Sequence, residues 1–398
     1  ESYDTLCLIY SDKPHSKGFI VTNCTFEFSD STQSCSALRF TSNKHNIEIS
    51  ETKFINTFSK DPGSAIYIQQ AETSAKISWC SFTTTLSENS HGSALLLNDM
   101  NTDIDISYCD FNDCSQGTPS YAITTNRALV NLHHVRFLNT TETTASYPIY
   151  YDINDVLNLN DRIFENVTSS LPIFNFPGDS SLPYSTVNFD RCQITDCNVP
   201  SYLIFASIET FTFKSSIINY TIVGGPSLLA AVIYSSSETV DISYSQFTNT
   251  NSNGTIKYDS QGSQTIDYCI FDNCKGLQSV CFDIKADYDK LTFENNIIQN
   301  IQNSEISFGK FEFISGNDIE FEFSNITFSQ NSNQYYSSIT LNTQFEFSDN
   351  VVEISFNNCK WLSNQNPNAY GGAISIPSTF NRNVNFNSCI FDGNTGHN

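Results

Sequence analysis

The side chains of this sequence with the most reactive chemistry are its 13 cysteines, and their spacing is regular. A first group lies two residues before an aromatic or aliphatic residue and comprises Cys24, Cys80, Cys109, Cys192, Cys269, Cys359 and Cys389. A second group lies five residues after members of the first and comprises Cys114, Cys197 and Cys274. Small residues of one type at one position of a repeat indicate a buried stack of thiols. The alternative is a local disulfide in each pair five residues apart, Cys109–Cys114, Cys192–Cys197 and Cys269–Cys274, if both sulfurs point inward across a turn.

Metal and cofactor chemistry is not indicated. The sequence has no Cys-x-x-Cys pair and only 6 His, so a zinc site is not expected. His133 and His134 are the only adjacent histidines. Neighbours in a strand face opposite ways, so these two imidazoles cannot bind one metal ion together. We expect no metal and no cofactor.

Carbohydrate-active β-structures need acidic pairs that converge from adjacent segments. The acids at the expected outward positions are Glu48, Asp105, Asp241 and Glu322, and they do not stand on consecutive repeats. We therefore expect a solvated acidic face, no catalytic residue and no enzymatic activity.

N-glycosylation sequons mark expected corners or loops of the chain. They begin at Asn23, Asn139, Asn166, Asn219, Asn253 and Asn325. Their number is no larger than chance predicts in a sequence so rich in Asn, Ser and Thr, but their placement permits modification if the protein is extracellular.

A repeat of about 28 residues must position all of these groups. Its anchors are Phe26, Phe54, Phe82, Phe111, Phe137, Phe164, Ile194, Ile218, Phe247, Phe271, Ile298, Phe328, Trp361 and Phe391. Five residues upstream every position is apolar, as at Ile49, Ile77 and Ile106, and seven residues upstream only Gln264 is polar. Polar residues separate the two columns, which is the period-two pattern of a strand with one buried face.

A second strand precedes the next anchor by about seventeen residues and begins with Ala. Its copies read Ala37–Phe40, Ala65–Ile68, Ala94–Leu97, Ala122–Ile123 and Ala373–Ile376, and small residues such as Gly63, Gly92, Gly371 and Gly372 precede it. Short strands at this period cannot form separate cores. Stacked coils, by contrast, give each strand parallel neighbours and join the apolar columns into one core. The pattern predicts an all-β fold, a right-handed parallel β-helix solenoid of about fourteen coils that extends over residues 1–398 as a single unit.

Part of the repeat resembles the polymorphic outer-membrane protein repeat of bacterial surface adhesins and similar repeats of protist surface proteins. The residues that carry the resemblance are Gly371–Ile374 (Gly-Gly-Ala-Ile) and the aromatic-x-x-Asn segments Phe328–Asn331, Trp361–Asn364 and Phe391–Asn394. Looser copies stand at Gly63–Ile66 and Gly92–Leu95. The resemblance implies a surface-exposed β-helix with an adhesive or interaction role, and the residue usage fits a protist.

The charge balance excludes several partners. With 42 acidic and 19 basic residues the net charge is −23, which disfavours nucleic acid, anionic membranes and acidic polymers. No apolar run is long enough to span a membrane. We expect an extracellular or cell-surface location.

Three functions remain open. The first is a non-enzymatic rod that mediates adhesion or binds proteins or glycans. The second is a structural subunit of a filament, coat or other assembly, and the third is a polysaccharide-active enzyme. Because Phe391–Asn394 is a complete anchor with no cap after it, we also expect the chain to be part of a longer protein or to associate end to end or laterally with copies of itself.

Overall fold

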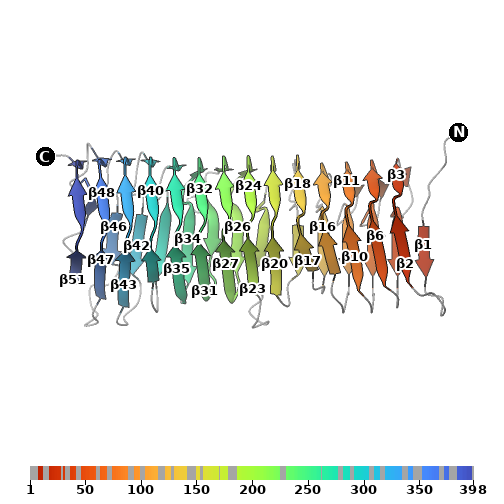
Figure 1. The fold of residues 1–398 in the computed structure, drawn as a ribbon, viewed down its shortest axis with the longest axis horizontal. Helices are drawn as coiled ribbons and strands as arrows, with labels where there is room; N and C mark the ends of the chain where they lie inside the picture. Colours follow the sequence, from red (N-terminus) through yellow and green to blue (C-terminus); the bar gives the residue numbers. More distant parts are fainter. Residues whose placement is uncertain are drawn as a thin grey trace. The chain divides into compact units, whose positions relative to one another are not determined.

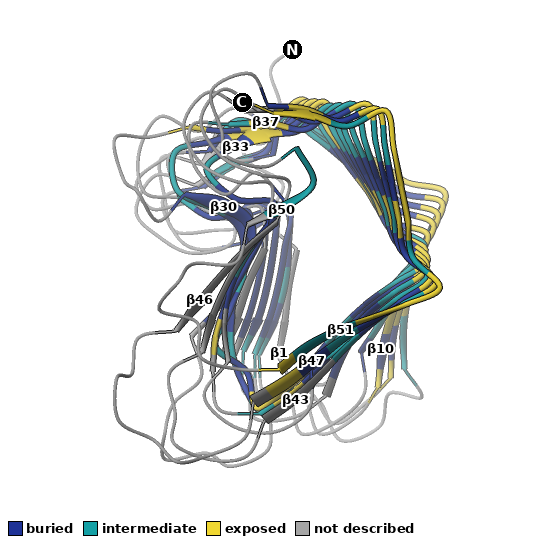
Figure 2. Cartoon of the chain, turned by 90° about the vertical axis from the view of Figure 1, so that its left-hand side faces the viewer, coloured by how far each residue is buried: buried dark blue, intermediate teal, exposed yellow. Residues whose placement is uncertain are grey.

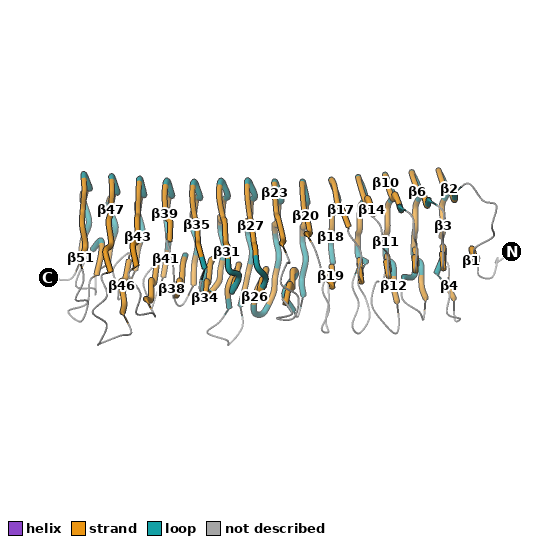
Figure 3. Tube along the Cα trace, turned by 90° about the horizontal axis from the view of Figure 1, so that it is seen from below, coloured by secondary structure: helices purple, strands orange, loops and turns teal. Residues whose placement is uncertain are grey.

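A computed structural model gives the fold of the chain. It describes residues 8–11, 18–27, 30–31, 36–41, 46–59, 63–69, 74–87, 94–98, 104–114, 122–126, 130–140, 149–152, 156–169, 171–177, 186–224, 230–260, 262–276, 281–286, 291–303, 309–313, 319–333, 339–343, 352–366, 372–375 and 383–396. Within these residues every regular element is a β-strand (Figure 3). The chain divides into two compact units, Glu1–Pro200 and Ser201–Asn398. That residues 1–398 form a single solenoid stays a prediction.

In the first unit, successive strands of each sheet come from successive coils and lie side by side (Figure 1). The first sheet contains β2 (Phe19–Thr22), β6 (Ile47–Ser50), β10 (Ala75–Ser78), β14 (Ile104–Ser107), β17 (Val130–His133), β20 (Val156–Asn160) and β23 (Thr186–Asp190). The second sheet contains β3 (Thr25–Glu27), β7 (Lys53–Ile55), β11 (Ser81–Thr83), β15 (Asp110–Asn112), β18 (Arg136–Leu138), β21 (Ile163–Glu165) and β24 (Gln193–Thr195). The third sheet contains β1 (Leu8–Ser11), β5 (Leu38–Thr41), β9 (Ile66–Gln69), β13 (Leu95–Asn98), β16 (Ile123–Asn126) and β19 (Ile149–Asp152). Shorter strands are β4 (Asp30–Ser31), β8 (Phe58–Ser59), β12 (Leu86–Ser87), β22 (Phe174–Pro177) and β25 (Asn198–Val199).

The second unit repeats this plan. Its first sheet contains β27 (Thr210–Lys214), β31 (Thr239–Ser243), β35 (Ser263–Asp267), β39 (Leu291–Glu294), β43 (Ile319–Ser324), β47 (Val352–Asn357) and β51 (Asn383–Asn387). Its second sheet contains β28 (Ile217–Asn219), β32 (Gln246–Thr248), β36 (Ile270–Asp272), β40 (Ile297–Gln299), β44 (Thr327–Ser329), β48 (Lys360–Leu362) and β52 (Ile390–Asp392). Its third sheet contains β26 (Tyr202–Ser207), β30 (Ala231–Ser235), β34 (Ile256–Ser260), β38 (Phe282–Ala286), β42 (Gly309–Phe313), β46 (Ile339–Thr343) and β50 (Ile374–Ser375). A fourth, narrow sheet contains β29 (Ile222–Val223), β33 (Asn251–Ser252), β37 (Lys275–Gly276), β41 (Gln302–Asn303), β45 (Ser332–Asn333), β49 (Gln365–Asn366) and β53 (Thr395–Gly396).

The parallel pairing confirms the predicted register. Ile77 of β10 pairs with Ile49 and with Ile106, which are the same position of the preceding and following coils. The anchors pair in the same way, as Phe82 does with Phe54 and Phe111. The predicted parallel β-solenoid with a period near 28 residues is therefore confirmed; its handedness stays a prediction.

The apolar columns form the interior, as the alternation of the sequence predicts, except at Phe386 and the anchor Phe391, which are 39% and 49% exposed. Ile77, Ile106 and Ile242 are fully buried. Anchor rings stack along the interior, with centroids 5.0 Å apart for Phe54 and Phe82. Such ring pairs add about 0.5–1.5 kcal/mol beyond the area that they bury.

The turn before the third-sheet strand needs the small residue that the sequence places there. Gly63 has a φ of 73°, and a Cβ on it would lie 2.7 Å from the carbonyl oxygen of Ile66. Gly92, Gly371 and Ile376, which the sequence assigns to equivalent turns and strands, lie outside the described residues.

Candidate functional site: an exposed ladder at the corner between two sheets

A single residue forms the corner between the first and second sheets of each coil, and it adopts a left-handed backbone. In the first unit these residues are Asn23, Glu51, Trp79, Tyr108, His134, Asp161 and Arg191, with φ between 51 and 58°. In the second unit they are Ser215, Tyr244, Tyr268, Asn295, Asn325, Asn358 and Ser388, with φ between 51 and 56°. Figure 2 shows exposed residues along this corner.

The left-handed conformation costs a residue with a bulky side chain about 1 kcal/mol or more, whereas Asn and Asp tolerate it. Trp79, Tyr108, His134 and Arg191 therefore occupy a position that disfavours them. Strain of this kind motivates a search for function at the residues that bear it.

The corner residues of five consecutive coils, Trp79, Tyr108, His134, Asp161 and Arg191, form what we call the corner ladder. The rings of Trp79 and Tyr108 stack with centroids 4.3 Å apart and an interplanar angle of 2°. The Tyr108 and His134 rings follow, with centroids 4.7 Å apart. The ladder thus begins with three stacked rings at the spacing of the strands.

The rings of the corner ladder remain open to solvent. Trp79 is 62% exposed and Tyr108 is 45% exposed. Since one face of the indole is covered by Tyr108, an exposure of this size requires that the edge and much of the other face of Trp79 be open. That open face points along the stack, toward the coil that carries Glu51.

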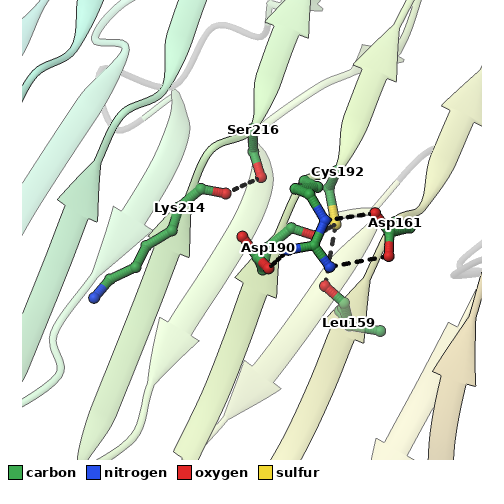
Figure 4. Close-up of polar contacts among 7 residues, drawn as sticks. Leu159, Asp161, Asp190, Cys192, Lys214 and Ser216 are labelled. Atoms are coloured by element: carbon green, nitrogen blue, oxygen red, sulfur yellow. Dashed lines mark hydrogen bonds and ion pairs between the residues drawn. The ribbon is translucent and has the colours of Figure 1, made fainter.

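The other end of the corner ladder is ionic. The Arg191 guanidinium donates from Nε to Asp161 Oδ1 at 2.7 Å and from Nη2 to Asp161 Oδ2 at 3.0 Å, and it also contacts Asp190 (Figure 4). The hydrogen bonds from Arg191 hold the pKa of Asp161 below its ordinary value, and His134 and Arg162 act in the same direction. Asp161 is therefore a fixed anion at neutral pH.

The second unit uses its corner differently. Tyr244 and Tyr268 form one stacked pair, with centroids 4.9 Å apart. After them the corner changes to asparagine, and Asn325 Nδ2 donates to Asn295 Oδ1 at 3.0 Å. Asn295 Nδ2 in turn donates to Asp267 Oδ1 at 2.9 Å. These amides satisfy one another and hold neighbouring coils together.

The cysteines of the repeat lie where a buried thiol stack requires them. Cys80, Cys109, Cys192, Cys269 and Cys359 of the first group are buried thiols, whereas Cys24 is exposed and Cys389 is half-buried. Cys114, Cys197 and Cys274 are also buried thiols.

The two sulfurs of each predicted pair point to carbonyls of different strands. Cys109 Sγ donates to Ser107 O at 3.3 Å, and Cys114 Sγ donates to Phe82 O at 3.2 Å. The disulfides Cys109–Cys114, Cys192–Cys197 and Cys269–Cys274 are not formed in this structure, and they stay predictions for the oxidised protein.

The histidine pair divides as the strand geometry predicts. His134 is exposed on the corner ladder, and His133 is half-buried at the end of β17. Within the described part of the chain no three His, Cys, Asp or Glu side chains are grouped as a metal site requires.

Two of the four outward acids, Asp241 and Glu322, have local partners. Asp241 Oδ2 lies 2.6 Å from the Lys214 ammonium, which Figure 4 shows at the end of β27. Glu322 Oε1 accepts hydrogen bonds from Ser324 and Asn357. Glu48 is exposed, and Asp105 is half-buried beside Lys76 in the register. That none of these acids is catalytic stays a prediction.

Five of the six sequon asparagines lie outside the strands, whereas Asn219 is the last residue of β28, and several are engaged by neighbouring amides. Asn139 Nδ2 donates to Asn112 at 3.0 Å, and Asn166 Nδ2 donates to Asn139 at 2.9 Å. Asn325 Nδ2 donates a hydrogen bond to Asn295, and Asn219 Oδ1 accepts a hydrogen bond from Asn249 Nδ2. Asn23 is exposed at its corner, and Asn253 is half-buried.

The corner ladder is the feature that sequence reasoning missed. Its signal was present three residues before each anchor, where Asn, Asp and Ser alternate with Trp, Tyr, His and Arg. A column rich in Asn and Asp indicates a left-handed turn, and aromatic residues inside such a column are exceptions that invite a functional explanation.

Comparisons with known proteins returned little. No family model matches the chain, and no curated protein matches it. Among solved structures, the chain is similar to the catalytic domain of a GH87 α-1,3-glucanase determined in complex with tetrasaccharides. The alignment covers 95% of this chain and 70% of that domain, with 10% identity and a TM-score of 0.32. At these values no residue role or activity is carried over.

This finding corrects one expectation. The sequence favoured a non-enzymatic rod for adhesion, whereas the similar solved structure is an enzyme domain with bound oligosaccharide. The adhesive rod is therefore wrong as the leading function. In the described residues no helix has the length and hydropathy of a membrane span.

Proposed function

We propose that the chain is a polysaccharide-active β-solenoid that holds a neutral polysaccharide along the corner ladder. The observation that carries this proposal is the exposed stack of Trp79, Tyr108 and His134 at backbone positions that favour Asn. The fold does not demand these rings, since Asn325 and Asn358 occupy the same corner position in the other unit.

The chemistry of the corner ladder suits a sugar. A pyranose ring presents an apolar C–H face and a rim of hydroxyl groups. The open indole face of Trp79 can take the apolar face of one sugar, and the indole N–H and the Glu51 carboxylate can bond its rim. The imidazole of His134 and the carboxylate of Asp161 lie two and three coils farther along and can bond other sugars of the chain. Aromatic surface with a few placed polar groups is the usual composition of a ligand site.

The repeat of the fold suits a polymer. Corner residues recur at the spacing of parallel strands, about 4.8 Å. The five coils of the corner ladder therefore extend over about 19 Å, enough for several sugar units in a row.

Electrostatics favours a neutral chain. The net charge of −23 repels a polyuronate or sulfated glycan, and the one cation of the corner ladder, Arg191, is already paired with Asp161 and Asp190. A glycosidase acid needs a raised pKa, whereas the pKa of Asp161 is lowered. The corner ladder therefore holds the sugar chain and does not supply the general acid.

The location follows from the ligand. Structural polysaccharides are mostly extracellular, so we extend the proposal to an extracellular site of action with N-glycans at exposed sequons such as Asn23. Mass spectrometry of the protein from its native source tests this: an unmodified Asn23 would count against secretion. The resemblance to surface-protein repeats extends, on this proposal, to the β-helix repeat alone.

The test uses substitutions that respect the backbone. Trp79→Asn and Tyr108→Asn remove a ring but supply the residue that best tolerates the left-handed conformation. Tyr220→Asn is the matched control, because Tyr220 is 59% exposed with a φ of 48° but belongs to the other unit and to a different corner. Each protein is titrated calorimetrically with a panel of soluble neutral polysaccharides and with one polyuronate.

The proposal expects the parent to bind at least one neutral polysaccharide and not the polyuronate. Trp79→Asn should weaken that binding about tenfold or more, which corresponds to about 1.4 kcal/mol of stacking. Tyr220→Asn should bind as the parent does. Absence of binding across the panel, or equal binding by Trp79→Asn, would contradict the proposal.

A further inference from the structure

At two places in the chain, two cysteines occupy the same position of neighbouring coils. Cys80 lies between Ser78 and Ser81, and Cys109 lies between Ser107 and Asp110. The flanking residues are paired, Ser78 with Ser107 and Ser81 with Asp110, and Asp110 N donates to Cys80 O at 3.0 Å. The two cysteines are therefore rungs of the same column in adjacent coils.

The second pair repeats this arrangement in the other unit. Cys359 and Cys389 are flanked by the paired residues Asn357 and Asn387 and by Lys360 and Ile390. Ile390 N donates to Cys359 O at 2.9 Å. The same geometry thus occurs twice.

The thiols of the first pair point the same way. Cys80 Sγ and Cys109 Sγ each donate to the carbonyl two residues earlier, at 3.3 Å. The neighbouring Cys109 thiol lowers the pKa of Cys80, whereas burial raises the pKa of Cys109. Cys80 therefore ionises more readily than Cys109.

We propose that Cys80 and Cys109 form a reversible disulfide between adjacent coils, and that Cys359 and Cys389 do the same. Neighbouring parallel strands place the Cα atoms about 4.8 Å apart, inside the range of about 4.4–6.8 Å that disulfides allow. Parallel side chains leave the Cβ atoms at a similar separation, slightly beyond the usual range of about 3.5–4.5 Å. The coils must close by a fraction of an ångström, and a bond formed under such strain is more easily reduced.

The oxidant is a low-molecular-weight disulfide. The Cys80 thiolate attacks one of its sulfurs, the small S–S bond breaks, and one small thiol leaves with the proton that Cys80 gave up. The Cys109 sulfur then attacks Cys80 Sγ in the mixed disulfide. A second small thiol leaves with the Cys109 proton, so two protein thiols are oxidised and one small disulfide is reduced to two thiols.

The site lies directly beneath the corner ladder. Trp79 precedes Cys80 in the chain and Tyr108 precedes Cys109, so the disulfide would lock the two coils under the exposed ring stack. Only 2 Trp are present, and Trp361 stands two residues after Cys359. Each thiol pair therefore has a nearby tryptophan to report on it. This inference does not depend on the polysaccharide proposal.

The test exposes the folded chain to oxidised glutathione until Cys24, the exposed thiol, is fully modified. Free thiols are then alkylated, and the digest is mapped by mass spectrometry without reduction. We expect peptides that join Cys80 to Cys109 and Cys359 to Cys389. Cys269 is the matched control: it is buried in the same column, but Ser245 and Asn296 occupy the neighbouring coils, so it should be recovered as a thiol.

A serine variant keeps the outcome interpretable. Cys109→Ser should fold, because Ser216 and Ser245 occupy this column naturally. The parent should show a change of tryptophan emission on oxidation that dithiothreitol reverses, and Cys109→Ser should lose the part that comes from Trp79. Recovery of Cys80 and Cys109 as free thiols, or as two separate glutathione adducts, after Cys24 has reacted completely would overturn the proposal.

Discussion

The corner between the first and second sheets has the same backbone in both units but different side chains. In the first unit it carries Trp79, Tyr108, His134, Asp161 and Arg191 on five consecutive coils, whereas in the second unit one stacked pair, Tyr244 and Tyr268, is followed by Asn295, Asn325 and Asn358. The asparagines accept the left-handed conformation readily and bond along the stack. The aromatic rings accept it at a cost and leave their edges in solvent. The difference separates what the fold requires at this corner from what the first unit adds to it.

The largest expected effect concerns the interior, which the two units share. Burial raises the pKa of Cys197 to about 12 in the first unit and of Cys269 to about 12 in the second, against an ordinary value of 9.0. Between pH 9 and about 12 the unfolded chain loses these protons and the folded chain keeps them, so stability should fall as the pH rises through this window.

One such thiol contributes on the order of 4 kcal/mol, and several act together. Circular dichroism melts at rising pH should show that both units lose thermal stability above pH 9, and Cys197→Ser should reduce this loss. Melting that is independent of pH above 9 would show that these thiols are not buried as described.

Truncation of an inward-facing side chain should lower the free energy of unfolding in either unit. Ile106 and Ile242 are fully buried at the same position of their coils. Replacement of either by Ala should lower the free energy of unfolding by about 2–5 kcal/mol, because the lost methyl groups leave a cavity. Denaturant midpoints of the two variants unchanged from the parent would refute the register that defines the corner.

Substitutions at the corner itself should distinguish the two regions. Asn325→Ala removes a ladder amide and places Ala in a left-handed conformation, so it should cost about 1 kcal/mol. Trp79→Asn loses about 0.5–1.5 kcal/mol of stacking but relieves backbone strain of similar size, so its net effect should be smaller. If Trp79→Asn proves the more destabilising of the two, the rings serve the fold, and the contrast drawn here fails.

The smallest expected effect is electrostatic. The folded pKa of Asp161 lies below its ordinary value of 3.8, so its contribution to stability is present above that value and is lost as the pH falls through the folded pKa. Asp161→Asn should reduce this loss of stability at acid pH slightly, by less than about 1 kcal/mol, since the ion pair with Arg191 is exposed and screened by salt. The stability of both proteins is measured against acid pH at low and at high salt. Identical curves for the two proteins at low salt would mean that the Asp161–Arg191 pair contributes nothing to stability.

The sequence predicted the fold from columns that obey simple rules. The alternation at Glu48 and Ile49 and the turn at Gly63 follow from burial and backbone sterics, and both appear in the structure as expected. The corner ladder could not be found in this way, because its residues violate the local preference instead of expressing it. The columns did place Cys80 and Cys109 on consecutive coils, but the disulfides predicted from the sequence were those within one coil.

The most direct test of the corner ladder as a ligand site uses the contrast between the two tryptophans. Trp361 is fully buried and Trp79 is 62% exposed, so acrylamide should quench essentially the emission of Trp79 alone. We predict that a neutral polysaccharide bound by the chain protects Trp79 from acrylamide in a saturable manner, with the same midpoint as the calorimetric titration. Quenching that stays unchanged while the polysaccharide binds would place the ligand elsewhere and contradict the assignment of the corner ladder as the binding site.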